Sequence, residues 1–294
     1  QIIDGTKEFH GVKAIKNVNF TLLKGEIHSL LGENGAGKST MTKVAAGVYQ
    51  LSSGSFIYEG KETTFLTPSE ALKNGVVMVF QENSLVPNMT VSQNIYLGAE
   101  NFFNSLAKLN IKASRFLQSL NFNVDPNLLV SQLGAAQKQM VEIARAVHHN
   151  AKVIIFDEPT ATLTPEEKHH FFGLMQRLKK EGVSIVFISH ALEEALEHSD
   201  RITVLRDGEL IETDTAKKFN RERIVKAMIG RDLTDSAYAS KKTITKKPRK
   251  RGKKTLEVEN LSMGSMVKNS TFSAYSGQIT GVFGLVGSGR TEMM

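Results

Sequence analysis

The 294-residue sequence contains no cysteine and no tryptophan, and it has only 6 prolines. Without cysteine there can be neither a disulfide framework nor a thiolate metal site, so zinc–thiolate and dithiol redox chemistry are excluded. No apolar run approaches the roughly 20 residues that span a bilayer, and residues 1–20 lack the basic-then-apolar pattern of a secretory signal. We therefore expect a soluble polypeptide, and its 40% hydrophobic content is enough for a packed core.

The formal net charge of +7 raises the question of a nucleic-acid partner. Many of the basic residues gather in one run, KKTITKKPRKRGKK at residues 241–254, and do not lie along a recognisable reading helix. A solvated linker is the simpler interpretation of this run. No nucleic-acid partner is therefore expected.

The segment LGENGAGKST, residues 31–40, contains the pattern G-x-x-x-x-G-K-[ST]. The apolar run before it predicts a strand and MTKVAAGVYQ after it predicts a helix, which is the context that a phosphate-binding loop requires; a glycine-rich turn without a ligand is the weaker alternative. Lys38 would contact the β- and γ-phosphates of a bound nucleotide, and Ser39 would ligate Mg²⁺. The predicted nucleotide-binding residues here are Gly32, Glu33, Asn34, Gly35, Ala36, Gly37, Lys38, Ser39 and Thr40.

Polar side chains also follow three other short apolar runs. Asp157 and Glu158 follow VIIF, Gln81 follows VVMVF, and His190 follows IVFIS. Asp157 would hold Mg²⁺ and Glu158 would orient or deprotonate the attacking water, while Gln81 would ligate Mg²⁺ or position water and His190 would contact the γ-phosphate. Each residue alone could be an exposed strand end, but the carboxyl ends of strands are where α/β sheets bind ligands. We therefore predict Glu158, His190 and Gln81 as catalytic, and Ser39, Gln81 and Asp157 as metal ligands.

The order of patterns along the chain predicts an α/β fold. The β-branched runs KVIIFDE and VSIVFISH indicate buried parallel strands, with a helix expected between them in PEEKHHFFGLMQRLKKEG. Residues 83–149, approximately, have mostly helical spacing and are expected to form a helical insertion. The tetrapeptide RDGE in DRITVLRDGELIET indicates a hairpin turn.

A second copy of the phosphate-loop pattern lies near the end of the sequence. KGEIHSLLGENGAGKST at 24–40 aligns without a gap with SGQITGVFGLVGSGRTE at 276–292, and Arg290 replaces Lys38. A repeat of this length predicts two homologous domains. We expect a first domain at 1–235, a basic linker at 236–254 and the truncated start of a second domain at 255–294, so that the chain would be a fragment.

The combination of these motifs with LGAAQKQMVEIARA and FDEPTATLT resembles the ATPase subunit of ATP-binding-cassette (ABC) transporters over residues 1 to about 230. QKQMVEIARA, DEPTATLTPEE, SDRITVLRDGE and GLVGSGRTE resemble, more narrowly, the tandem-cassette ATPases of bacterial monosaccharide importers. The resemblance implies a P-loop NTPase ABC ATPase core with an antiparallel β subdomain and a helical insertion. It also implies ATP and Mg²⁺ as cofactors, and adenine stacking by Phe9, for which a core position on a strand is the alternative.

The resemblance further implies partners and a composite site. The partners would be membrane permease subunits and a sugar-binding protein at the cytoplasmic face of the membrane, with a docking surface around residues 82–98 whose apolar residues could equally be core. Paired cassettes, either a second ABC domain of the same chain or a homodimer, would use the signature residues Leu133, Gly134, Ala135, Ala136 and Gln137 on the ATP of the other cassette. Gly134 replaces the family's signature serine, and Thr164 stands where an Asp is common. A soluble tandem-cassette ATPase acting on ribosomes or nucleic acid is the alternative function.

Overall fold

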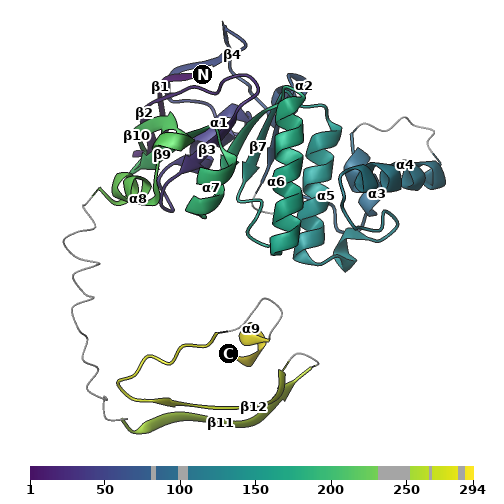
Figure 1. Cartoon of the computed structure of the whole chain (residues 1–294), viewed down its shortest axis with the longest axis vertical. Coiled ribbons are helices and arrows are strands. Elements are labelled where there is room, and N and C mark those ends of the chain that lie inside the picture. Colours follow the sequence, from purple (N-terminus) through teal and green to yellow (C-terminus); the bar gives the residue numbers. More distant parts are fainter. Residues whose placement is uncertain (81–83, 99–104, 231–251, 265–266, 284–288) are drawn as a thin grey trace. The chain divides into compact units, whose positions relative to one another are not determined.

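In the computed structural model, the described residues are 1–80, 84–98, 105–230, 252–264, 267–283 and 289–294 (Figure 1). They belong to two units, Gln1–Leu233 and Thr234–Met294, which are described separately. No helix among the described residues is long and apolar enough to cross a membrane.

A six-stranded sheet in the order β10-β9-β3-β8-β7-β6 forms the centre of the first unit. Its strands are β3 (Ile27–Leu31), β6 (Val76–Val79), β7 (Val153–Asp157), β8 (Ser184–Ile188), β9 (Arg201–Arg206) and β10 (Glu209–Thr215). All pairs are parallel except β9 with β10, which form the predicted hairpin. Every residue of β3 and β8 is buried, as expected for apolar strands at the middle of a parallel sheet.

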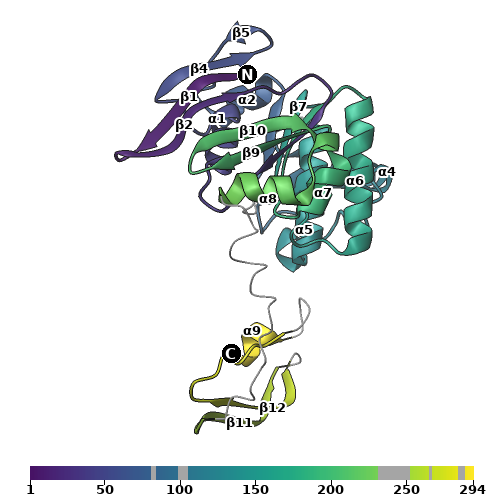
Figure 2. The same cartoon turned by 60° about the vertical axis from the view of Figure 1, so that its left-hand side comes forward.

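A second, antiparallel sheet has the order β2-β1-β4-β5. It is built from β1 (Ile2–Phe9), β2 (Val12–Phe20), β4 (Ser53–Tyr58) and β5 (Lys61–Glu62), and Figure 2 shows it beside β9 and β10. Ile2, Ile15, Val18 and Phe20 bury their side chains in a core shared with Leu30 and Met41 of the α/β part. The predicted antiparallel β subdomain is thereby confirmed.

The helices of the first unit lie on both sides of the six-stranded sheet and beyond its β6 edge (Figure 1). They are α1 (Lys38–Ala45), α2 (Pro68–Lys73), α3 (Val91–Tyr96), α4 (Leu106–Ser119), α5 (Ala135–His148), α6 (Pro165–Lys180), α7 (Leu192–His198) and α8 (Arg221–Ile229), with short 3₁₀ helices at Val130–Gln132 and Ala216–Lys218. Thr164 begins α6 as its N-cap: its hydroxyl accepts the Glu167 N–H, and the Glu167 carboxylate accepts the Thr164 N–H at 2.7 Å. Thr164, which departs from the family pattern, therefore has a role in helix capping.

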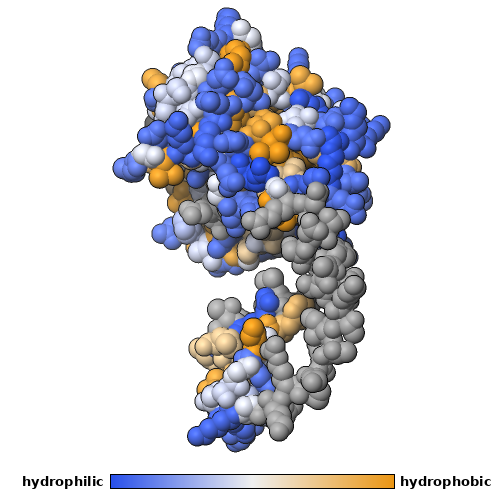
Figure 3. Space-filling model, turned by 90° about the vertical axis from the view of Figure 1, so that its left-hand side faces the viewer, coloured by the Kyte–Doolittle hydropathy of each residue, from blue (hydrophilic) through white to orange (hydrophobic). Residues whose placement is uncertain are grey.

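The predicted helical insertion is formed by α3, α4 and α5, which pack on one another. Val91, Ile95 and Tyr96 of α3 are buried in the same core as Leu117 of α4 and Ile143 of α5. In the described part of the region 82–98, Leu85, Val91, Ile95 and Tyr96 belong to the core, Val86 and Met89 are partly buried, and Pro87 and Leu97 are exposed. On the face drawn in Figure 3, hydrophobic side chains of the first unit form small patches in a mostly hydrophilic surface.

The second unit contains an antiparallel pair, β11 (Lys254–Met263) with β12 (Val267–Tyr275), and the short helix α9 (Arg290–Met293). The repeat offset places these elements where β1, β2 and α1 stand in the first unit. The apolar run at 278–283, which matches β3, forms no strand, and Ile279 and Phe283 are almost fully exposed.

Candidate active site

The phosphate-loop pattern lies between the end of β3 and the start of α1, as predicted. Gly37 caps α1 with a left-handed φ of 99°, and a Cβ at this position would lie 2.7 Å from the Ala14 carbonyl oxygen. Glycine is therefore required at residue 37 both by its conformation and by the close approach of β2.

Lys38 points back into its own loop. Its ammonium donates hydrogen bonds to the carbonyl oxygens of Gly32 at 2.8 Å and Glu33 at 3.0 Å, and only 5% of the residue is exposed. Burial lowers the pKa of Lys38, while the nearby carboxylates of Glu158 and Asp157 act in the opposite direction. A cation is thus held at the centre of the loop.

Asp157 ends β7 and is 3% exposed. Burial raises the pKa of this carboxyl group, and a hydrogen bond with Ser39 opposes that shift. Among the residues that the structure describes, its Oδ1 atom is buried without a hydrogen-bond partner. A buried carboxylate oxygen that lacks a partner, next to a serine hydroxyl, is the donor set that a small divalent cation such as Mg²⁺ prefers.

Glu158 and His190 meet at the carboxyl ends of the adjacent strands β7 and β8. The Oε1 atom of Glu158 lies 2.5 Å from Nε2 of His190, and the Glu158 backbone N–H donates to the Ile188 carbonyl at 3.0 Å. Glu158 has a left-handed φ of 52°, which is uncommon for a residue with a side chain and is held here by that backbone bond.

A cavity of about 480 Å³ joins these features. The residues that line it come from β2, the phosphate loop, and the ends of β7 and β8: Ala14, Asn34, Gly35, Gly37, Lys38, Ser39, Thr40, Glu158 and His190. A larger cavity of about 630 Å³ lies at the amino ends of β7 and β8 and is lined mainly by apolar side chains such as Met41 and Phe56. The smaller cavity is the one that the phosphate loop lines together with Glu158 and His190, so it is the candidate site.

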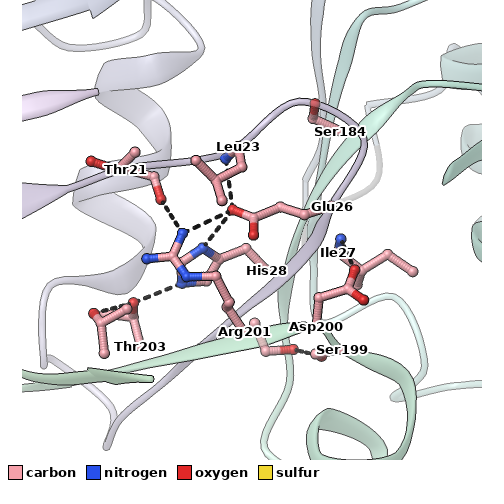
Figure 4. Close-up of polar contacts among 12 residues, drawn as sticks. Thr21, Leu23, Glu26, Ile27, His28, Ser184, Ser199, Asp200, Arg201 and Thr203 are labelled. Atoms are coloured by element: carbon pink, nitrogen blue, oxygen red, sulfur yellow. Dashed lines mark hydrogen bonds and ion pairs between the residues drawn. The ribbon is translucent and has the colours of Figure 1, made fainter. Parts of the chain in front are cut away.

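Two sets of contacts that the sequence analysis missed hold β3 and the phosphate loop that follows it. In the first, the Glu26 Oε1 atom accepts hydrogen bonds from the Leu23 N–H at 2.7 Å and from Arg201 at 3.2 Å, and it contacts Nδ1 of His28 (Figure 4). The other ring nitrogen of His28 lies 2.7 Å from the Thr203 hydroxyl, and burial lowers the pKa of this histidine. A charged residue before an apolar strand is the only sequence signal for this network.

The second set of contacts is made by the turn of the β9–β10 hairpin. The Gly208 N–H donates to the Ala36 carbonyl at 3.2 Å, and the Gly208 carbonyl accepts from the Lys16 N–H at 2.7 Å. The turn therefore bridges the phosphate loop and β2. The RDGE pattern predicts a turn but not what it touches.

The remaining predicted residues lie outside the cavity wall or outside the described residues. Phe9 packs edge-on against Tyr49, with ring centroids 5.0 Å apart, and is not among the lining residues. Leu133 is buried, whereas Gly134 and Ala135 are exposed at the start of α5, where Gln137 accepts the Gly134 N–H. Gln81 lies outside the described residues. Adenine stacking by Phe9 and the signature contact of 133–137 stay predictions.

The sequence profile of the family described as "ABC transporter" matches residues 15–161, which are half of the chain. The chain belongs to the ABC transporter family. Membership implies a nucleotide-binding domain. Similar solved structures include the ADP conformation of an ATP-binding cassette of an ABC transporter, at 27% identity and a TM-score of 0.68, covering 78% of this chain and 98% of that one. A dimeric bacterial ABC transporter cassette is 28% identical with a TM-score of 0.66, covering 74% and 99%. The predicted ABC ATPase fold is confirmed.

Among similar curated relatives of this ABC protein are two sugar-import proteins. The galactose/methyl galactoside import ATP-binding protein of Photobacterium profundum is 43% identical over 98% of this chain. The ribose import ATP-binding protein of a Chelativorans species is 41% identical over 99% of it. The chain spans only 58% and 56% of the length of these relatives.

Proposed function

We propose that this chain is the ATP-binding and ATP-hydrolysing part of an ABC importer that energises the uptake of a simple sugar. The observation that carries the proposal is the single cavity into which the phosphate loop, Glu158 and His190 all open. The names of the relatives support the substrate class, a monosaccharide. On the same basis we place the chain at the cytoplasmic face of the membrane, as a peripheral subunit. Its partners would be permease subunits and a sugar-binding protein.

In this proposal ATP binds with its phosphates on residues 32–40. Lys38 has three N–H donors, and among the described residues only the Gly32 and Glu33 carbonyls accept from it, which leaves the third donor for the β- and γ-phosphates. Ser39 and Asp157, with Gln81 as the further candidate, would hold Mg²⁺, which when bound neutralises phosphate charge. Phe9 would stack on adenine.

Glu158 and His190 have different roles in the hydrolysis that we propose. Glu158 is placed to accept a proton from the attacking water, and His190 to donate a hydrogen bond to the γ-phosphate. Their contact at 2.5 Å would be exchanged for contacts with water and phosphate when ATP binds. This division makes Glu158 the general base and His190 a residue that senses the phosphate.

We also propose the domain division 1–235, 236–254 and 255–294, and a composite site in which residues 133–137 of one cassette complete the ATP site of another. The exposed start of α5 supports this role, because a helix N-terminus can present N–H groups to a phosphate. Gly134 has no hydroxyl, so one charge-assisted hydrogen bond of about 1.5–3 kcal/mol is missing from that contact.

The test is reconstitution of the polypeptide with its permease. Uptake of labelled ribose or galactose into vesicles should require ATP and should be lost in Glu158→Gln, whereas the variant should still bind ATP. ATP-independent uptake, or uptake that survives Glu158→Gln, would contradict the proposal. The alternative of a ribosome or nucleic-acid factor predicts RNA retention that falls steeply with salt, and the relatives do not favour it.

A further inference from the structure

The two proposed reacting side chains stand on separate loops that need a common support. Glu158 follows β7 and is succeeded by turns at residues 159–162 before α6, and His190 lies between β8 and α7. Their strands are paired only up to Asp157 and Ile188. Among the described residues, the bond from the Glu158 N–H to the Ile188 carbonyl is the last backbone contact between the two loops, so the residues beyond it are held by side chains.

Glu194, in the first turn of α7, contacts both loops through one oxygen atom. Its Oε2 atom accepts a hydrogen bond from the Thr160 hydroxyl at 2.8 Å and another from the Ser189 hydroxyl at 2.9 Å. Thr160 is two residues after Glu158, and Ser189 immediately precedes His190. One carboxylate oxygen therefore bonds both a residue close to Glu158 in sequence and the residue next to His190.

The hydroxyl groups that contact Glu194 are buried, and the carboxylate has a further charged partner. Thr160 and Ser189 are 5% and 3% exposed, so their hydroxyl groups depend on protein partners. The other Glu194 oxygen, Oε1, accepts from the Lys168 ammonium of α6 at 2.8 Å, and the Ser189 hydroxyl accepts from the Ala191 N–H at 3.0 Å. Four segments of the chain, the Thr160 loop, α6, the Ser189 loop and α7, meet at one carboxylate.

We propose that Glu194 is a positioning residue, which holds the loops of Glu158 and His190 at the separation that hydrolysis requires. It touches neither ATP nor water in this proposal and acts through Thr160 and Ser189. Lys38 is held instead by carbonyls of its own loop, so nucleotide binding and the Glu194 contact are separable. The part of the inference that concerns hydrolysis rests on the function proposed above.

The first test needs no nucleotide. The ring ¹⁵N signals of His190 are recorded in the ¹⁵N-histidine-labelled chain and assigned by their absence in His190→Asn. Glu194→Ala should shift them, because the ring is no longer held 2.5 Å from Glu158. The matched control is Glu193→Ala on the same helix, whose side chain is 68% exposed and pairs with Arg221 at 3.3 Å; it should leave the signals in place. Identical signals in Glu194→Ala and the unaltered chain would overturn the proposal.

The second test separates affinity from turnover. Glu194→Ala should bind Mg-ATP as the unaltered chain does, yet its turnover should fall about 10- to 100-fold, as misplaced reacting groups cause. Glu194→Gln should recover much of the loss, since its amide oxygen can still accept both hydroxyl groups. Equal turnover in all three proteins would refute the inference. A chain that neither binds nor hydrolyses ATP would contradict the proposed function instead, and the ring signals would still decide the role of Glu194.

If Glu194→Ala does not fold, Thr160→Val and Ser189→Ala each remove one hydroxyl group at nearly constant volume. Each should shift the His190 signals. Folded variants that leave those signals unchanged would show that Glu194 holds neither loop.

Discussion

Replacing Lys38 by alanine is the most direct test of the phosphate-loop assignment. The ammonium has two partners among the described residues, the carbonyls of Gly32 and Glu33, which leaves one of its three donors for a phosphate oxygen. A hydrogen bond from a charged donor contributes about 1.5–3 kcal/mol, so its loss should weaken Mg-ATP binding about 10- to 150-fold. The side chain is buried, and no other lysine or arginine is among the described residues that line the cavity.

The assay is titration of a fluorescent ATP analogue against Lys38→Ala, with Lys73→Ala as the control. Lys73 is an exposed lysine in the last turn of α2 and has no place in the cavity wall. Thermal unfolding of both variants without nucleotide checks that the loop still folds. An affinity of Lys38→Ala equal to that of Lys73→Ala, in a folded protein, would refute the assignment.

Four further outcomes are expected. Glu158→Gln should bind ATP normally and lose most turnover, because an amide cannot act as a base; equal turnover would move the base elsewhere. The chain alone should hydrolyse ATP very slowly, with specific activity that rises with protein concentration; brisk, concentration-independent activity would refute the composite site. Gly37→Ala should lower the Tm and ATP affinity together, since its Cβ would lie 2.7 Å from the Ala14 carbonyl and its φ of 99° disfavours a side chain. Burial would raise the pKa of Glu194, but hydrogen bonds from Lys168 and two hydroxyl groups hold this pKa below its ordinary value of 4.5. The ionised Glu194 should therefore stabilise the fold above pH 4.5, and this stabilisation should disappear as the pH falls through the lowered pKa. The Tm difference between the unaltered chain and Glu194→Gln should accordingly vanish as the pH falls below 4.5 and through the lowered pKa, and a pH-independent difference would contradict the assignment.

The parts of the fold that the sequence could predict are those with strong local signals. The buried strands β7 and β8 are short β-branched runs, α6 has its Pro165 and capping residues, and the β9–β10 turn has its Asp-Gly pair. The convergence of Lys38, Asp157 and His190 follows from the rule that parallel strands bind ligands at their carboxyl ends.

The supporting contacts could not be predicted because they join residues that are distant in sequence through ordinary side chains. Glu194 is one of three glutamates in ALEEALEH, and helical spacing alone does not show which of them meets Thr160, 34 residues earlier. Gly208 is the glycine of a turn motif, and its left-handed φ of 83° already explains why a glycine stands there. That its N–H also holds the Ala36 carbonyl depends on how β9 pairs with β3.

The two phosphate-loop patterns show how far a strand depends on such distant partners. KGEIHSLL and SGQITGVF have the same apolar spacing, and α1 and α9 begin at matching positions after a left-handed glycine. Yet β3 is a fully buried strand between β8 and β9, whereas residues 278–283 form no strand and expose Ile279 and Phe283. The apolar spacing is the same in both copies, so spacing alone does not form the strand, and β8 and β9 supply the pairing that β3 has. The phosphate loop of the first unit is therefore specified by residues as far along the chain as Gly208, and not by residues 24–40 alone.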